Sequence, residues 1–163
     1  MNIRKSCFTA FMSCISFILS TFVSFPFVVP FQHFCNVICA VLVGPVYGLI
    51  SALITSIMRM LLTGRPVTAI IGAVIGAFLS GLFYKCSGKM ILAAVGELIG
   101  TGLISAVVSY YVMKYGFGID LTSPFYYIPL FMPASLAGAI LGYIVLQILK
   151  KSRTLIKLQE MLS

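Results

Sequence analysis

Long apolar runs separated by Gly or Pro residues dominate the chain, and their lengths predict membrane-spanning helices. A helix needs about 20 apolar residues to cross the hydrocarbon core of a bilayer. Six apolar segments follow one another, and the breaks between them contain Gly or Pro. They cover approximately residues 6–28, 30–43, 45–62, 68–84, 90–111 and 126–149. We therefore expect an all-α integral membrane protein, a bundle of six transmembrane helices forming one domain over residues 1–163.

The second segment is the weakest of the six. A helix from Pro30 to Val43 would be only about 21 Å long, short of the ~30 Å hydrocarbon core. Joining it to the third segment would give one helix far longer than a bilayer requires. We therefore expect a short second helix followed by a tight turn at Gly44-Pro45.

Composition supports a membrane protein and excludes most soluble functions. The 163 residues are 61% hydrophobic and 9% charged, whereas soluble domains are about 45–50% apolar and about 25% charged. Six spans leave no room for a soluble ATPase domain, so any energy must come from a partner or an ion gradient. The five cysteines form no C-x-x-C pair. We expect no cofactor, no metal site and no disulfide framework.

Charge placement predicts the orientation. With the amino terminus inside, eight cations fall on the cytoplasmic side and three, with Asp120, on the other, which is a positive-inside bias. The eight are Arg4, Lys5, Lys85, Lys89, Lys150, Lys151, Arg153 and Lys157, and the three are Arg59, Arg65 and Lys114. Five spans would put the last four cations on the wrong side. We expect both termini in the cytoplasm, and residues 150–163 to be a basic tail lying on anionic lipid rather than binding nucleic acid.

Polar residues inside the apolar segments fall into stripes. The stripes comprise Ser16, Ser20 and Ser24; Gln32, His33 and Asn36; Ser51, Thr55, Arg59 and Thr63; and Glu97, Thr101, Ser105 and Ser109. Residues four apart share one helix face, and intramembrane polar groups usually face the bundle interior or a cavity. Interhelical hydrogen bonding explains such stripes more often than ligand binding does. A structural ion pair between Glu97 and Arg59 is a further alternative.

Helix geometry places the ionisable members of these stripes at compatible depths. Arg59 lies about 21 Å along its helix from the inner turn at Pro45, and His33 about 17 Å from that turn. Asn36 and Glu97 each lie about 12 Å from the inner side, near the midplane. These groups could converge on a cavity that opens to the outer side.

Aromatic residues are positioned to close such a cavity. The loop Phe25–Phe31 joins the first two segments at the outer side, and Tyr126 and Tyr127 arrive at the same level. We expect the loop to act as a lid over the cavity, although an interfacial aromatic belt would have the same composition.

Three segments contain Gly-x-x-x-Gly, which lets helix backbones approach closely in lipid. The pairs are Gly72/Gly76, Gly96/Gly100 and Gly138/Gly142. Because three different helices share the pattern, we expect packing within one bundle rather than a dimer interface.

Enzyme motifs are absent from the sequence. There is one histidine, no H-E-x-x-H and no G-x-S-x-G, so we expect no catalytic residue. A channel is disfavoured because no ring of repeated charges appears.

Several patches of the sequence resemble the ThiW family of thiamine-precursor transporters. The most specific are the P-x-Q-H-x-x-N-V segment at Pro30–Val37 and the G-E-x-x-G-T-G segment at Gly96–Gly102. The others are Ala40–Gly48, Met58–Gly64, Gly76-Ala77 and Gly81–Tyr84. The chain departs from the family pattern after the third segment, where Arg65–Gly72 lies near the expected mouth of the pocket.

The resemblance implies a substrate-binding (S) component of an energy-coupling-factor transporter, in the plasma membrane of a bacterium. Such subunits work with a transmembrane coupling subunit and two cytoplasmic ATPases, which hydrolyse the ATP. The implied substrate is hydroxyethylthiazole, the thiazole half of thiamine. The implied docking positions for the coupling subunit are small residues on the first helix, here Ser6, Ala10 and Cys14.

The residues and the resemblance together predict a binding site for a small heteroaromatic ring. Gln32, His33, Asn36 and Glu97 would hydrogen-bond the ligand, and Arg59 would hold Glu97 ionised. Phe31, Tyr126 and Tyr127 would stack on or close over the ring, and Thr101 completes the site. An autonomous small-solute transporter or an oligomeric channel is the main alternative, and a small membrane enzyme using His33 is a weaker one.

Overall fold

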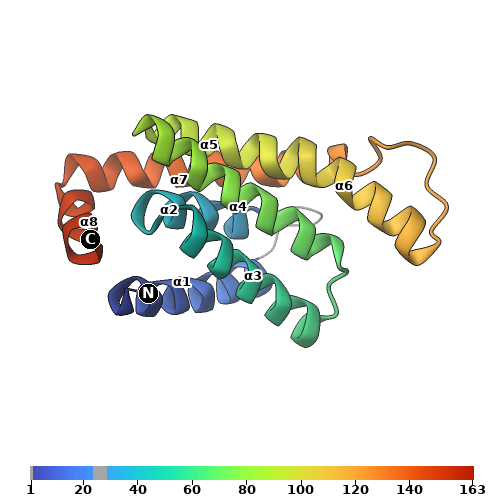
Figure 1. Ribbon diagram of the computed structural model, residues 1–163, viewed down its shortest axis with the longest axis horizontal. Helices are drawn as coiled ribbons and strands as arrows, with labels where there is room; N and C mark the ends of the chain where they lie inside the picture. Colours follow the sequence, from blue (N-terminus) through green and yellow to red (C-terminus); the bar gives the residue numbers. More distant parts are fainter. Residues whose placement is uncertain (1, 24–28) are drawn as a thin grey trace.

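The computed structural model describes residues 2–23 and 29–163, which fold into a helical bundle (Figure 1). Its elements are α1 (Ile3–Phe22), α2 (Pro30–Leu42), α3 (Gly44–Thr63), α4 (Thr68–Ser87), α5 (Met90–Ile99), the π-helical η1 (Gly100–Ser105), α6 (Ala106–Tyr111), the π-helical η2 (Val112–Gly116), α7 (Ile128–Lys151) and α8 (Thr154–Leu162). The prediction of an all-helical protein is confirmed.

Among the described residues, five helical segments are long and apolar enough to cross a membrane. They are α1, α3, α4, the continuous stretch Met90–Gly116 that runs from α5 to η2, and α7. The apolar helix α2 is shorter, at 13 residues, as the sequence predicts. The fifth segment extends to Gly116, five residues beyond its predicted end at residue 111. The first helix ends at Phe22, and residues 24–28 of the predicted first span lie outside the described residues.

Glycine and proline set the helix boundaries inside the bundle. The tight turn predicted at Gly44-Pro45 is confirmed, because Gly44 has a φ of 84° and begins α3 with proline next to it. Gly64 and Gly88, with φ of 66° and 67°, end α3 and α4 in the left-handed conformation that glycine adopts without a steric penalty.

Helix α2 lies at the centre of the bundle. It packs against α1, α3, α4, α5, α7 and α8, and ten of its thirteen residues are buried. A helix surrounded by protein has no need to match the thickness of the lipid. The central position therefore explains why α2 can be too short to span a bilayer.

The glycine pairs bring the helices of this one chain together. An added Cβ at Gly96 would lie 2.7 Å from the Leu79 carbonyl oxygen, and one at Gly100 would lie 2.7 Å from the Gly76 Cα. A Cβ at Gly138 would lie 2.6 Å from the His33 Cβ. The prediction that these pairs pack the bundle is confirmed.

The C-terminal segment folds back onto the bundle instead of forming only a tail. Leu155 and Leu162 of α8 are buried, and the Gln159 side-chain amide donates to the Val41 carbonyl oxygen at 3.2 Å and to the Tyr84 hydroxyl at 3.0 Å. The expectation that residues 150–163 lie along the lipid as a tail missed this helix. Leu155 and Leu162 are covered by the bundle, while Ile156 and Met161 are each 51% exposed.

Both chain ends lie at one end of the molecule (Figure 1). The Asn2 side-chain amide donates to the Ser163 carbonyl oxygen at 2.9 Å, and Arg4 Nη1 donates to the Met161 carbonyl oxygen at 3.3 Å. The connections after α3 and η2 lie away from this terminal end (Figure 1).

Replacing Gly96 by Ala tests the close packing of α5 on α4. The new methyl group would meet backbone atoms of Leu79 and Ser80, which cannot rotate away. We expect the free energy of unfolding to fall by about 1–3 kcal/mol, measured by thermal unfolding of the purified protein. Gly116→Ala is the matched control, because its Cβ would have no neighbour closer than 4.0 Å. Equal stability of the two variants would contradict the inferred close approach.

Candidate functional site

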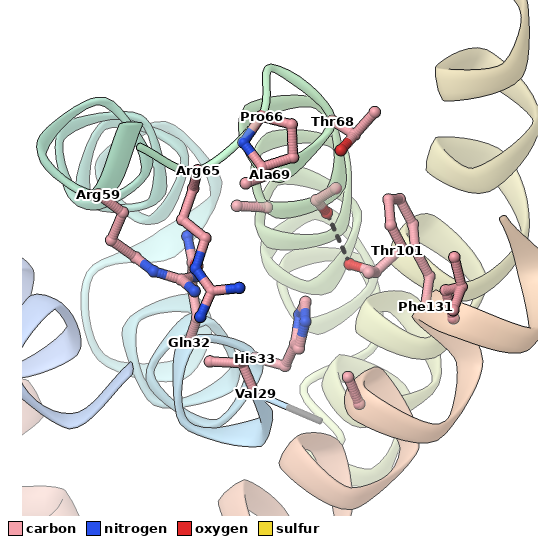
Figure 2. Close-up of a pocket in the computed structure, with 14 residues that line it drawn as sticks. Val29, Gln32, His33, Arg59, Arg65, Pro66, Thr68, Ala69, Thr101 and Phe131 are labelled. Carbon is pink, nitrogen blue, oxygen red and sulfur yellow. Dashed lines mark hydrogen bonds between the residues drawn. The ribbon is translucent and has the colours of Figure 1, made fainter. Parts of the chain in front are cut away.

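A cavity of about 200 Å³ opens between α2, α3, α4, η1 and α7 (Figure 2). It lies where α3 ends and where α2, α4 and α7 begin, away from the chain termini. Its lining comprises Val29, Gln32, His33, Arg59, Arg65, Pro66, Thr68, Ala69, Gly72, Ala73, Thr101, Leu130, Phe131 and Ala134. Of the nine predicted binding residues, Gln32, His33, Arg59 and Thr101 line it directly.

The Glu97 carboxylate is the centre of a buried polar network behind the cavity wall. Its side chain is 0% exposed, and its Oε1 lies 2.8 Å from His33 Nδ1, 3.1 Å from Asn36 Nδ2 and 3.0 Å from Thr101 Oγ1. With Glu97 ionised, its carboxylate only accepts hydrogen bonds, and Nδ1 of His33 is then the donor in this contact. Among the described residues, Oε2 of Glu97 has no hydrogen-bond partner.

Further contacts hold the partners of Glu97 in place. Asn36 also donates to the Ala73 carbonyl oxygen at 3.2 Å. Thr101 Oγ1 lies 2.9 Å from the Gly72 carbonyl oxygen, the contact drawn in Figure 2, so its one proton has two acceptors within reach. A Cβ on Gly76 would lie within 3.0 Å of both carboxylate oxygens. The glycine therefore leaves the space that the carboxylate occupies.

Arg59 pairs with Gln32 and not with Glu97. Arg59 Nη1 donates to Gln32 Oε1, and both side chains are buried, at 5% and 2% exposure. The ion pair formed by the described residues joins Glu97 to His33. The prediction that Arg59 holds Glu97 ionised is therefore wrong, because the imidazole of α2 occupies the position next to the carboxylate.

The polar stripe that begins at Glu97 stays buried over its whole length. Thr101, Ser105 and Ser109 are each at most 1% exposed. In an α-helix, residues four apart turn about 40° past a full circle, so such a stripe drifts around the helix. The π-turn η1 closes on the fifth residue and turns less per residue, which offsets this drift.

Members of the polar stripe of the third helix join α3 to α1. Ser13 Oγ donates to Ser51 Oγ at 3.1 Å, and Thr55 Oγ1 donates to the Ser13 carbonyl oxygen at 3.2 Å. Interhelical hydrogen bonding is thus confirmed for Ser51 and Thr55, whereas Ser20 and Thr63 bond within their own helices and Arg59 reaches the cavity. Ser24 lies outside the described residues.

The aromatic residues are placed differently from expectation. Phe31, Tyr126 and Tyr127 are absent from the cavity lining, and Phe131 is the ring that faces it. Tyr127 packs against Phe131 with ring centroids 5.7 Å apart, while Tyr126 is exposed. The predicted lid at Phe25–Phe31 lies outside the described residues except for its last three positions.

Sequence reasoning missed Arg65 and the start of α4 as cavity residues. The four-residue spacing could not find Arg65, because α3 ends at Thr63 and the chain reverses at Gly64. The sequence does predict that the segment Arg65–Gly72 lies near the mouth of the pocket. This segment departs from the pattern of the family that the sequence resembles.

Replacing Thr101 by Val tests the buried network. Valine keeps the shape but removes the hydroxyl, leaving the Gly72 carbonyl oxygen without this donor. We expect a loss of about 1–3 kcal/mol in the free energy of unfolding, measured by thermal or denaturant unfolding. Thr101→Ser should retain most of the stability, and Thr122→Val, at an exposed position, should retain all of it. If Thr101→Ser is as destabilised as Thr101→Val, the loss of stability in the serine variant comes from the missing methyl group and not from the hydroxyl.

The family comparison gives one match, and it covers most of the chain. The family model described as "Thiamine-precursor transporter protein (ThiW)" matches residues 6–152. No curated protein and no solved structure matches the chain.

Proposed function

The chain belongs to the ThiW family of thiamine-precursor transporters, multi-pass membrane proteins without enzymatic activity, and on this premise we propose that it is the substrate-binding subunit of an ATP-driven energy-coupling-factor transporter. The cavity beside Gln32, His33 and Arg59 is the proposed binding site, and hydroxyethylthiazole is the proposed substrate. Family membership also sets aside the alternative of a small membrane enzyme.

The observation that carries the proposal is a small cavity with buried polar atoms that lack partners. Gln32 Nε2 and Arg59 Nε have no hydrogen-bond partner among the described residues. Drug-sized ligands occupy pockets of roughly 300–1,000 Å³, so about 200 Å³ suits a single ring with a short side chain.

The residues of the site divide into direct contacts and positioning residues. His33, Gln32 and Arg59 bind the polar atoms of the ligand, and Phe131 packs against its ring. Glu97 and Asn36 act through His33, because Glu97 fixes the protonated nitrogen of the imidazole and Asn36 orients the carboxylate.

Charge placement supports a cavity that faces the outside. Eight cations lie in segments near the terminal end, where Asn2 meets Ser163, and this bias favours a cytoplasmic location for both termini. Arg59 and Arg65 line the cavity away from that end. A site open to the outer side is what uptake requires.

The proposed partners are a transmembrane coupling subunit and two cytoplasmic ATPases. Ala10 and Cys14 lie exposed on α1, while Ser6 is half-buried. Small exposed residues one turn apart allow a second helix to approach closely in lipid. This face of α1 is the proposed docking surface.

Ligand titration of the purified protein tests the substrate. We expect hydroxyethylthiazole to bind more tightly than the pyrimidine precursor or thiamine, measured by calorimetry. Glu97→Gln should weaken binding about fivefold, since a neutral acceptor orients His33 less strongly, and the variant should remain folded. Glu160→Gln, in α8 at the terminal end, is the matched control. Tighter binding of either competitor would overturn the thiazole assignment.

Co-purification tests the partners. Ala10→Trp should abolish association with the coupling subunit and ATPases without changing ligand affinity, because the bulky ring separates the helices. Leu136→Trp, at an exposed position of α7, should leave association intact. Uptake into vesicles without any ATPase would instead support an autonomous transporter or an oligomeric channel.

A further inference from the structure

Among the described residues, neither arginine of the cavity is paired with a carboxylate, although Glu97 lies behind the cavity wall next to His33 and Thr101. Arg59 and Arg65 line the cavity, and the lining contains no Asp or Glu. The ion pair found in residues 2–23 and 29–163 joins His33 to Glu97, so neither arginine takes part in it. The sequence of residues 24–28 contains no acidic residue either.

Arg59 is the cation whose burial most requires a partner. Its side chain is 5% exposed, one nitrogen donates to Gln32, and Nε has no partner among the described residues. A guanidinium cannot be deprotonated in a protein, so burial cannot be relieved by neutralisation. Gln32 Nε2, also buried, is a second donor that lacks an acceptor. Two adjacent buried donors need acceptors, and because one of them is charged, an acceptor oxygen with negative charge forms the stronger hydrogen bond.

Arg65 provides a second guanidinium at the mouth of the cavity. It is exposed and follows the left-handed turn at Gly64. Figure 2 shows the side chains of Arg59 and Arg65 directed toward the same part of the cavity, near Gln32, with Phe131 on the opposite side. The planar guanidinium matches carboxylate and phosphate oxygens through paired hydrogen bonds.

We propose that this cavity, beyond the neutral hydroxyethylthiazole of the proposed function, takes in preference a form of the small ring that carries an oxyanion, a phosphate monoester or a carboxylate. The oxyanion lies between Arg59 and Arg65 and accepts a hydrogen bond from Gln32 Nε2, while the ring lies toward Phe131. The identity of the ring rests on the proposed function, whereas the oxyanion rests on the two arginines. The same charges disfavour a cationic ring such as a thiazolium.

Calorimetry with the full chain in phosphatidylcholine nanodiscs tests the proposal. The probes are hydroxyethylthiazole, its phosphate monoester, the carboxylate anion of (4-methylthiazol-5-yl)acetic acid, and inorganic phosphate. We expect at least one of the two anionic thiazoles to bind at least about tenfold more tightly than the neutral alcohol. Arg59→Gln should weaken that anion about 30-fold and Arg65→Gln about fivefold, and each substitution should weaken the alcohol less than the anion.

Lys114→Gln is the matched control, since it removes a cation that does not line the cavity. If Arg59→Gln does not fold, the affinities measured with Arg65→Gln test the proposal, because Arg65 is exposed and its substitution leaves the buried network intact. If the neutral alcohol binds best and Arg65→Gln weakens no probe more than Lys114→Gln does, the oxyanion is overturned but the proposed function stands. If inorganic phosphate binds as tightly as the anionic thiazoles and Arg65→Gln weakens its binding, the arginine site is supported. The assignment of a thiazole as the ligand is then overturned.

A lipid phosphate is the competing occupant. If phosphatidylglycerol in the nanodisc abolishes binding of the anionic thiazoles, the arginines bind lipid and the proposal fails. It fails equally if none of the anionic probes binds, whatever the affinity of the alcohol.

Discussion

A carboxylate that is fully buried among apolar helices must be surrounded by donors, and this requirement organises the bundle around Glu97. Donors reach Oε1 from α2, through His33 and Asn36, and from η1, through Thr101. Gly76 of α4 lies close enough that a methyl group would collide with the carboxylate. The spacing of three elements is thus fixed by one charged group, and a shift of any one element would leave that group with fewer donors.

The position of α2 follows from the same arrangement and creates the cavity. This helix is enclosed by its neighbours, so thirteen residues suffice where a lipid-facing helix would need about twenty. The cavity lies at its amino-terminal end, where Val29, Gln32 and His33 contribute to the lining. A short central helix thus provides both the buried network and the space beside it.

Charge is divided between two roles in this protein. Most cations lie in segments near the terminal end and bias the orientation in the membrane, as the positive-inside rule describes. Arg59 and Arg65 instead line the cavity. Because lipid excludes unpaired charge, the few charged groups that remain inside the bundle mark its functional region.

The periodicity of polar residues in the sequence identified much of the site, but it could not predict which of these side chains contact one another. Four-residue spacing placed Gln32, Arg59 and Glu97 on interior faces, and all three are buried. Which of them meet depends on helix rotation and depth, which spacing does not determine. The sequence therefore favoured Glu97 with Arg59, whereas the packing of α2 brings His33 to the carboxylate.

Apolar run lengths, glycine and proline breaks and the distribution of cations determined by themselves that this is a helical membrane protein with a short second helix. These properties depend on local free energies of transfer and on backbone conformation, which each segment carries alone. Tertiary structure alone decided that Arg65 and Phe131 line the cavity, that Tyr126 does not, and that α8 packs on the bundle. Such contacts join residues far apart in sequence, and they arise only when the helices settle at particular angles and depths.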